Sequence, residues 1–359
     1  MQKDLEEDLI QQCLRDFRKY ADTVTVSAAV CHLFKENKDL GRYMGIEPKL
    51  NRIAQTPVTP DLAILYDNDA KGILFEIKWS LPQTSEWMEK KLKELKKYFD
   101  IFVNWKNGTG RVESHDVVLI CHPEDSDNVL QMIKKISSEN DYECFKNVGF
   151  SIWTWLLNPP KGGERSEQLR LIKLYGQTRN IELERKISNP LGILVPEEVL
   201  TFLRFTYFII KEEPPIQYLL NILIINVLLN PVALTYENFY EVDTDWIWNK
   251  AKSHISMGEE YDEHSLQIKR RWIRDSLNTL LELQIIQKDK KDNYWKIPTN
   301  LFRYVRKPIQ EIICIKLVKR HIQRMKQLKK ELPILGSRRT KTRLSGKESK
   351  LTDYIKKDK

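Results

Sequence analysis

Two acidic residues and one lysine in the first half of the chain have a spacing that suits metal-dependent hydrolysis. Asp61 follows a proline, and after a fifteen-residue step the sequence Glu76-Ile77-Lys78 places an acid two residues before a lysine. Two carboxylates that converge beside a lysine repel each other unless a divalent cation lies between them. The residue types therefore predict a Mg²⁺ or Mn²⁺ site, provided that the fold brings them together.

A β-hairpin is the element that must bring these residues together. The apolar runs 61–66 and 73–79 are separated by Asp-Asn-Asp-Ala-Lys-Gly, a sequence typical of turns. Strand side chains alternate between faces, so Glu76 and Lys78 share one face and apolar residues form the other. Pairing that is symmetric about the turn would place Asp61 opposite Lys78, which makes Asp61 and Glu76 diagonal neighbours.

This arrangement resembles the PD-(D/E)xK nuclease superfamily, which includes restriction-type, RecB-type and Holliday-junction-resolving enzymes. The resemblance covers roughly the first half of the chain and implies a restriction-endonuclease-like mixed β-sheet flanked by helices. It implies that Asp61 and Glu76 ligate the metal with help from the Ile77 carbonyl. It also implies that Lys78 positions or polarises the attacking water and offsets charge on the phosphate, so that a phosphodiester bond is hydrolysed.

The first helix and the helix after the lysine offer three more candidates. Families of this kind often add an acid from the first helix, and Glu6 falls within the apolar stripe of a predicted helix over 4–20. An acid on a core-facing stripe needs a reason, so we expect Glu6 to be a fourth catalytic residue. RecB-like members carry Gln-x-x-x-Tyr after the lysine, where this chain has Glu94-Leu-Lys-Lys-Tyr98. The resemblance thus implies a role for Tyr98 and, with glutamate in place of glutamine, for Glu94.

The first half of the chain alternates between helical and strand patterns. It begins with a helix over 4–20, a short apolar run over 23–33 and the hairpin over 61–79. A helix over 85–99, an apolar strand over 117–121, a further helix after 124 and two strands over 150–157 and 169–175 follow. This order predicts an α/β domain with a mixed sheet over residues 1–180. The polar segment 179–189, which ends at Pro190, indicates the domain boundary.

Residues 190–305 have the pattern of a mainly helical domain. The run 216–229 is apolar nearly all round, as expected of a buried helix, and 236–242 favours a shorter helix. A long helix over 265–283 precedes two short strands joined by a charged turn. This order resembles winged-helix domains, whose third helix enters the DNA major groove and whose wing touches the backbone. The resemblance implies DNA contacts by Lys269, Arg270, Arg271 and Arg274 of the helix and by Lys290 and Lys291 of the wing. A protein-binding winged helix with a solvated basic face is the alternative.

The excess positive charge lies in the basic tail, residues 306–359. From Lys316 onward the chain has 16 basic and four acidic residues, which gives +12, so the remainder carries 9 − 12 = −3. Such a segment, which includes Arg338 and Arg339, suits phosphate contact with release of counterions. The peptide Leu351-Thr-Asp-Tyr-Ile355 resembles the one with which DNA-processing enzymes dock on a sliding clamp, although Glu348 stands where glutamine is usual.

Composition limits the class of protein. The 359 residues are too many for one ordinary core, and 41% are hydrophobic, which suffices for packed interiors. Five scattered cysteines without a C-x-x-C pair favour a reducing compartment and argue against a disulfide scaffold or a zinc finger. The charged N-terminus predicts no signal peptide, and the longest apolar run is too short to span a bilayer. We therefore expect a cytoplasmic protein that associates with DNA and not with a membrane.

These patterns predict a two-domain DNA endonuclease in which the first domain cuts while the winged helix and tail hold the substrate. Because each such site cuts one strand, a homodimer is the expected assembly for cutting both. A DNA-binding regulator or adaptor with a degenerate nuclease fold is one alternative, against which the intact Asp61, Glu76 and Lys78 argue. An RNA-directed nuclease or toxin is a second alternative that the sequence leaves open.

Overall fold

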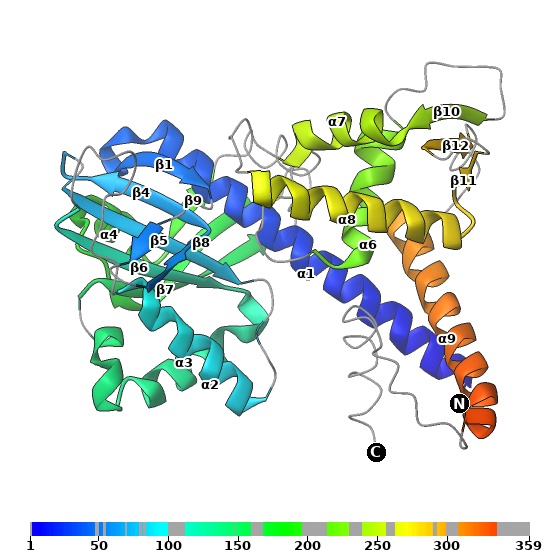
Figure 1. Cartoon of the computed structure of the whole chain (residues 1–359). Helices are drawn as coiled ribbons and strands as arrows, with labels where there is room; N and C mark the ends of the chain where they lie inside the picture. Colours follow the sequence, from blue (N-terminus) through cyan, green and yellow to red (C-terminus); the bar gives the residue numbers. More distant parts are fainter. Residues whose placement is uncertain are drawn as a thin grey trace.

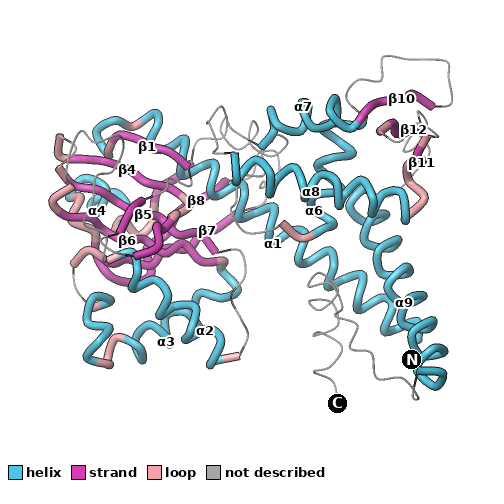
Figure 2. The backbone as a smooth tube through the Cα atoms, in the orientation of Figure 1, coloured by secondary structure: helices cyan, strands magenta, loops and turns pink. Residues whose placement is uncertain are grey.

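The computed structural model of the chain contains two groups of packed elements joined by one long helix (Figure 1). It describes residues 2–46, 50–52, 55–68, 70–78, 81, 84–99, 112–146, 148–158, 168–195, 214–229, 239–255, 263–289, 293–298 and 308–335. One group is a seven-stranded sheet with helices on both faces, and the other is a set of helices with a three-stranded sheet (Figure 2). The chain is therefore a mixed α/β protein, which confirms the prediction at this level.

The large sheet is mixed, with the strand order β1-β4-β5-β6-β7-β8-β9. Its strands are β1 (Arg42–Ile46), β4 (Leu62–Tyr66), β5 (Lys71–Lys78), β6 (Ser114–Cys121), β7 (Phe150–Asn158), β8 (Gln168–Gln177) and β9 (Ile193–Val195). The central strands β5, β6 and β7 are parallel, and the remaining pairs are antiparallel. A separate small hairpin consists of β2 (Leu50–Arg52) and β3 (Gln55–Val58). The predicted hairpin 61–79 is thus β4 and β5, next to the parallel centre of the sheet.

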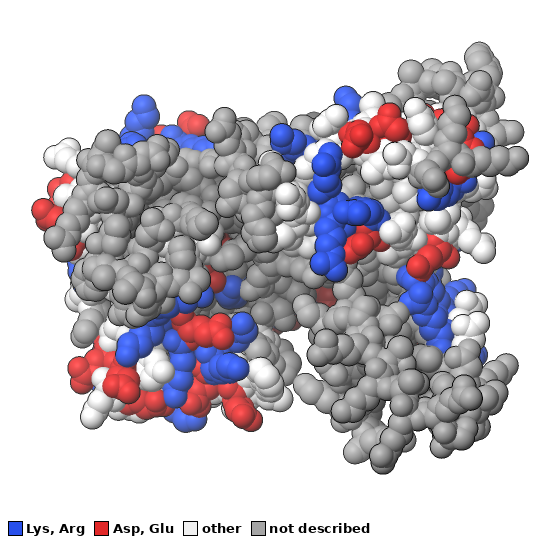
Figure 3. Space-filling model, viewed as in Figure 1, with Lys and Arg blue, Asp and Glu red and all other residues white. Residues whose placement is uncertain are grey.

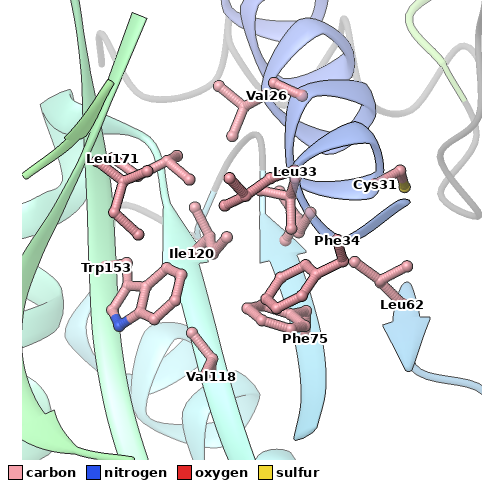
Figure 4. Close-up of a cluster of buried hydrophobic side chains, with 14 of the residues drawn as sticks. Val26, Cys31, Leu33, Phe34, Leu62, Phe75, Val118, Ile120, Trp153 and Leu171 are labelled. Atoms are coloured by element: carbon pink, nitrogen blue, oxygen red, sulfur yellow. The ribbon is translucent and has the colours of Figure 1, made fainter. Parts of the chain in front are cut away.

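Helices cover both faces of the large sheet. One face packs on α1 (Gln2–Glu36), and Phe34, Phe75 and Trp153 meet in that core (Figure 4). The other face, which includes Leu74 of β5, packs on α2 (Ser85–Lys93), the 3₁₀ turn η2 (Glu94–Tyr98) and α3 (Ser126–Ile136). Shorter helical turns are η1 (Lys38–Leu40), η3 (Pro123–Asp125), η4 (Asn140–Phe145) and α4 (Ile181–Ile187). Burial on both sides explains the nearly continuous apolar runs of β5 and β6.

Helix α1 continues to Glu36, whereas the predicted helix ended at Tyr20. The run 23–33 is rich in residues with low helix propensity, but their hydroxyl groups are satisfied inside the helix. Thr23 donates to the carbonyl of Lys19 at 2.8 Å, and Ser27 donates to the carbonyl of Thr23 at 2.8 Å. The predicted end of the helix is therefore wrong, because burial of this run against the sheet outweighs its propensity.

The two groups share α1, so neither is a single continuous segment of the sequence. Tyr20 belongs to the core of the second group, and Leu14 packs against α9 (Ile309–Leu335). At the other boundary, β9 pairs with β8 as far as Val195, and Asn180 caps α4 beside the sheet. The predicted boundary at residue 180 lies too early, because Leu183 and Ile187 of α4 and Ile193 and Val195 of β9 are buried in the first core.

The second group consists of helices around a sheet with the order β10-β12-β11. Its elements are α6 (Ile216–Ile222), which continues as a π-helical turn η5 (Leu223–Leu228), then β10 (Phe239–Asp243), α7 (Thr244–Ile255), α8 (Glu263–Glu282), β11 (Gln287–Lys288), β12 (Tyr294–Pro298) and α9. The short helix predicted over 236–242 is wrong, because residues 239–243 pair with β12 along their whole length. Among the described helices, none combines the length and the apolar character needed to cross a membrane.

A buried ion pair links α1 to η3, the short turn that follows β6. Lys19 Nζ lies 3.2 and 3.1 Å from the two carboxylate oxygens of Asp125, and both side chains are less than a tenth exposed. Asp125 immediately precedes α3 and also accepts a hydrogen bond of 3.2 Å from the Leu81 N–H. Removing one partner of such a pair leaves an uncompensated buried charge.

We predict that Lys19→Met lowers the free energy of unfolding by about 3–5 kcal/mol, because Asp125 keeps its charge without a cation. Urea unfolding followed by circular dichroism measures the change. Arg185→Met is the matched control, since Arg185 forms an exposed pair with Glu182 and exposed pairs contribute about 0–1 kcal/mol. Equal losses in the two variants would contradict a special role of the buried pair.

Candidate active site on β4 and β5

The hairpin register differs by two residues from the symmetric pairing. Leu62 pairs with Phe75, and the Asp61 N–H donates to the Phe75 carbonyl at 3.0 Å. The turn is tighter than predicted because Asp67 and Asn68 adopt positive φ angles of 54° and 52°, which these residue types tolerate. A shift by an even number of residues leaves every side chain on its predicted face. Asp61 therefore stands closer to Glu76 along the strands than the predicted pairing placed it.

The carboxylate of Asp61 is held against the backbone of β5. Its Oδ2 accepts a hydrogen bond of 2.6 Å from the N–H of Ile77, the residue between Glu76 and Lys78. The side chain is half-buried at the start of β4. Sequence spacing alone could not show this contact, which fixes the acid beside the Glu76-Ile77-Lys78 segment.

Glu76 is a buried acid that both a charged and a neutral donor contact. It is 7% exposed, on the sheet face that packs against α2, η2 and α3. Its Oε1 lies 2.7 Å from Lys78 Nζ, and its Oε2 accepts a hydrogen bond of 2.7 Å from the Tyr98 hydroxyl. These contacts offset the cost of removing the carboxylate from water. Asp61, Glu76, Lys78 and Tyr98 are therefore brought together, as the sequence pattern predicted for the first three and the resemblance implied for Tyr98.

Tyr98 is itself positioned by a residue that the sequence did not single out. The Tyr98 carbonyl accepts a hydrogen bond from Nε2 of His115, at 2.5 Å. Burial lowers the pKa of His115 below its usual value, which favours the neutral ring. A carbonyl oxygen can only accept, so Nε2 carries the proton in this contact. No motif links residues 98 and 115, so only the packing of η2 on the start of β6 reveals this contact. Glu94 is exposed and paired with Lys91, so the structure does not bring it to the site.

Glu6 does not join the site, contrary to prediction. It lies one turn before Ile10, in the part of α1 that packs near α9. Twenty residues separate it from Val26, where α1 meets the core of the large sheet, and that corresponds to about 30 Å along a helix. Glu76 moreover lies on the opposite face of the sheet from α1. Leu9 and Cys13 of the predicted stripe pack in a different core, with α9, whereas Leu5 of the same stripe is exposed.

The oxygen atoms of Asp61 and Glu76 are the donors that this site offers to a cation. Carboxylate oxygens and the Ile77 carbonyl are hard ligands of the kind that Mg²⁺ and Mn²⁺ bind. A carboxylate oxygen accepts more than one interaction, so the bonds from Lys78 and Tyr98 leave Glu76 able to ligate. In the part of the chain that the structure describes, no group of three or more histidine, cysteine or acidic side chains could hold a metal. Mg²⁺ commonly uses one or two carboxylates and completes its shell with water and phosphates, so the donor set fits this ion.

Of the four residues of α8 that were predicted to contact nucleic acid, three are exposed and one is buried. Arg271 and Arg274 are exposed on α8, and Arg270 is exposed with its guanidinium near Asp245 and over the ring of Trp248. Lys269 is 2% exposed and lies over the ring of Trp272, so its predicted role in contacting DNA is wrong. The remaining predicted contacts lie outside the described residues; they are Lys290, Lys291, Arg338, Arg339 and the peptide Leu351–Ile355.

Comparison with known proteins supplies no relative from which residue roles could be transferred. No family model, curated protein or solved structure matches the chain. The functional interpretation therefore rests on the geometry of β4, β5 and η2.

We predict that Tyr98→Phe lowers the free energy of unfolding by about 1.5–3 kcal/mol, the range for hydrogen bonds to charged groups. Chemical unfolding of the purified chain measures this loss. Tyr142→Phe is the control, because it keeps the ring that stacks on Phe145 in the same core, and it should change stability by less than about 0.5 kcal/mol. An unchanged Tyr98→Phe variant would mean that the hydroxyl does not support Glu76.

Proposed function

We propose that the chain is a metal-dependent nuclease that hydrolyses phosphodiester bonds of DNA. The observation that carries the proposal is the position of the Asp61 carboxylate on the Ile77 N–H, beside the contact between Glu76 and Lys78. These contacts support a site in which Asp61 is held on the backbone of β5 while Glu76 and Lys78 pair with each other on the same strand. Such a placement is compatible with the resemblance to PD-(D/E)xK nucleases.

Each residue of the site has a separate part in this proposal. Asp61 and Glu76, with the Ile77 carbonyl, would hold Mg²⁺ or Mn²⁺, which when bound activates water and stabilises charge on the phosphate. Lys78 keeps its ammonium next to Glu76 and can orient the water or offset the charge that develops on phosphate oxygens. Tyr98 holds Glu76 from the other side, so that its carboxylate keeps one orientation. A mixed sheet flanked by helices is compatible with a restriction-endonuclease-like fold for this part of the chain.

The second group supports a role in holding DNA. Its order is helix, strand, two helices and a small hairpin, with the first strand paired to the last, which resembles a winged-helix domain. In that comparison α8 corresponds to the helix that enters the major groove. Its exposed Arg270, Arg271 and Arg274 form a basic surface, and Figure 3 shows basic side chains gathered beside α8. The proposed enzyme therefore separates cutting, at β5, from binding, at α8 and the basic tail.

We predict that Asp61→Ala and Lys78→Ala each reduce cleavage at least about 100-fold, a loss typical of removing a group that stabilises transition-state charge. The purified chain is incubated with supercoiled, linear, branched and single-stranded DNA and with RNA, in Mg²⁺, Mn²⁺ or chelator. Chelator should abolish cleavage, while binding of DNA in chelator stays intact in both variants.

Lys71→Ala is the matched control for the cleavage assay, because Lys71 lies at the opposite end of β5 and pairs with Asp67. It should cut as the unchanged chain does. Cleavage that persists in both site variants would show that the site is misplaced, and cleavage of RNA alone would transfer the proposal to RNA.

We predict that removing residues 336–359 weakens DNA binding and flattens its dependence on salt. This segment carries nine basic and three acidic residues, a net +6, and each phosphate contact that is lost reduces the salt slope by about 0.9 for duplex DNA. The cut is placed after Leu335, the last residue of α9, because a cut after Lys316 would remove Val318 and Ile322, which pack against α1. Fluorescence anisotropy at several salt concentrations measures the slope, and an unchanged slope would exclude the tail from binding.

A further inference from the structure

The helix that follows β5 has two polar flanks with different surroundings. On the flank toward α3, charged side chains neutralise one another: Lys93 pairs with Glu89 and Glu139, and Lys135 of α3 pairs with Glu89. Lys96 lies over the ring of Tyr142 on the same side. Figure 3 shows lysines and acids interspersed over this part of the molecule. This flank is explained by the packing of α2 on its neighbours.

The flank away from α3 also contains one ion pair, between Lys91 and Glu94 at 3.2 Å, but it differs in presenting a tryptophan to solvent. Trp87, Lys91, Glu94 and Lys97 follow one another at spacings of four, three and three residues, which places them along one side of a helix whose last turn is 3₁₀. Trp87 is 57% exposed, and Lys90 Nζ lies 5.3 Å from the centre of its ring. A tryptophan with more than half of its surface in water gains little from the fold, so packing does not explain its position.

The end of this flank contacts a residue of the candidate active site. Lys97 Nζ lies 5.0 Å from the centre of the Tyr98 ring, and the Tyr98 hydroxyl contacts Glu76. Ten residues separate Trp87 from Lys97, which corresponds to about 15 Å along a helix. The Trp87 ring therefore lies a few nucleotide lengths along the helix from the lysine that contacts Tyr98.

We propose that Trp87 is a stacking platform for an unpaired base of the strand that the site cuts, and that Lys90 and Lys97 contact its phosphates. The inference rests on the proposed nuclease function and assigns its substrate class: single-stranded, frayed or flap-containing nucleic acid. An exposed indole stacks on any base, and lysines beside it neutralise the backbone. Paired bases in a continuous duplex offer no free face, so duplex binding does not use this platform.

The test compares binding of single-stranded and duplex DNA in chelator, so that it does not depend on cleavage. Fluorescence anisotropy of labelled oligonucleotides is measured for the full chain, for Trp87→Ala and for Trp87→Tyr, with single-stranded RNA as a further arm. Trp87→Ala should weaken single-strand binding about tenfold and duplex binding less than twofold, because stacking contributes about 1–3 kcal/mol per base. Trp87→Tyr should restore most of the affinity. A larger loss with RNA than with DNA would assign the platform to RNA.

Ile181→Ala is the matched control, because Ile181 is an exposed hydrophobic residue of the same sheet unit, at the start of α4. It should leave both affinities unchanged. Unchanged single-strand binding by Trp87→Ala would overturn the inference, as would an equal loss for duplex and single strand. If the chain cuts DNA but Trp87→Ala binds normally, only the platform fails. If Trp87→Ala loses single-strand binding but no variant or metal affects cleavage, the proposed function fails and the platform stands.

Discussion

A carboxylate buried among apolar side chains must be met by charge and by hydrogen bonds, and the surroundings of Glu76 follow from this requirement. Lys78 meets one oxygen from two residues along the same strand, and Tyr98 meets the other from η2. The contact from Tyr98 holds only while η2 stays against the sheet, which the bond from His115 supports. One buried charge thus couples the hairpin, the helix after it and the next strand into a single arrangement.

The second constraint is the sharing of α1 between two cores. One end of the helix packs with α9, its middle with α6, and its last turns with the large sheet. The pair between Lys19 and Asp125 lies between these regions and fastens the helix to the start of α3. Neither core is complete without α1, so the folding of the two groups is expected to be coupled.

Local patterns predicted the mixed α/β class and the strand face that carries Glu76 and Lys78, but not the contacts between distant segments. The alternation over 73–79 placed Glu76 and Lys78 correctly, because the period of a strand is set by its own backbone. The register was missed by two residues because the conformations of Asp67 and Asn68 decide how tightly the turn closes. Glu6 was misplaced because a stripe on a helix shows that it packs but not against which core.

Some errors had a signal in the sequence and others had none. Lys269 lies on the same helical stripe as Ile273, Ser276 and Leu280, all of which are buried, so its position in the period already indicated burial. The continuity of α1 could not be read from the run 23–33, because propensity favoured a break there and only tertiary packing overrides it. The contact between His115 and Tyr98 joins separate elements, and a single sequence contains no trace of it.

The long shared helix also sets a fixed distance within the molecule. Ile10, which packs near α9, and Phe34, which packs on β5, are 24 residues apart, and a helix of that length spans about 36 Å. A helix held by cores at both ends behaves as a rigid spacer and not as a linker. Helix α8 shares its core with Tyr20 of α1, and β5 packs on Phe34 of the same helix, so under the proposed function the point that holds DNA and the point that cuts it are both anchored to one helix.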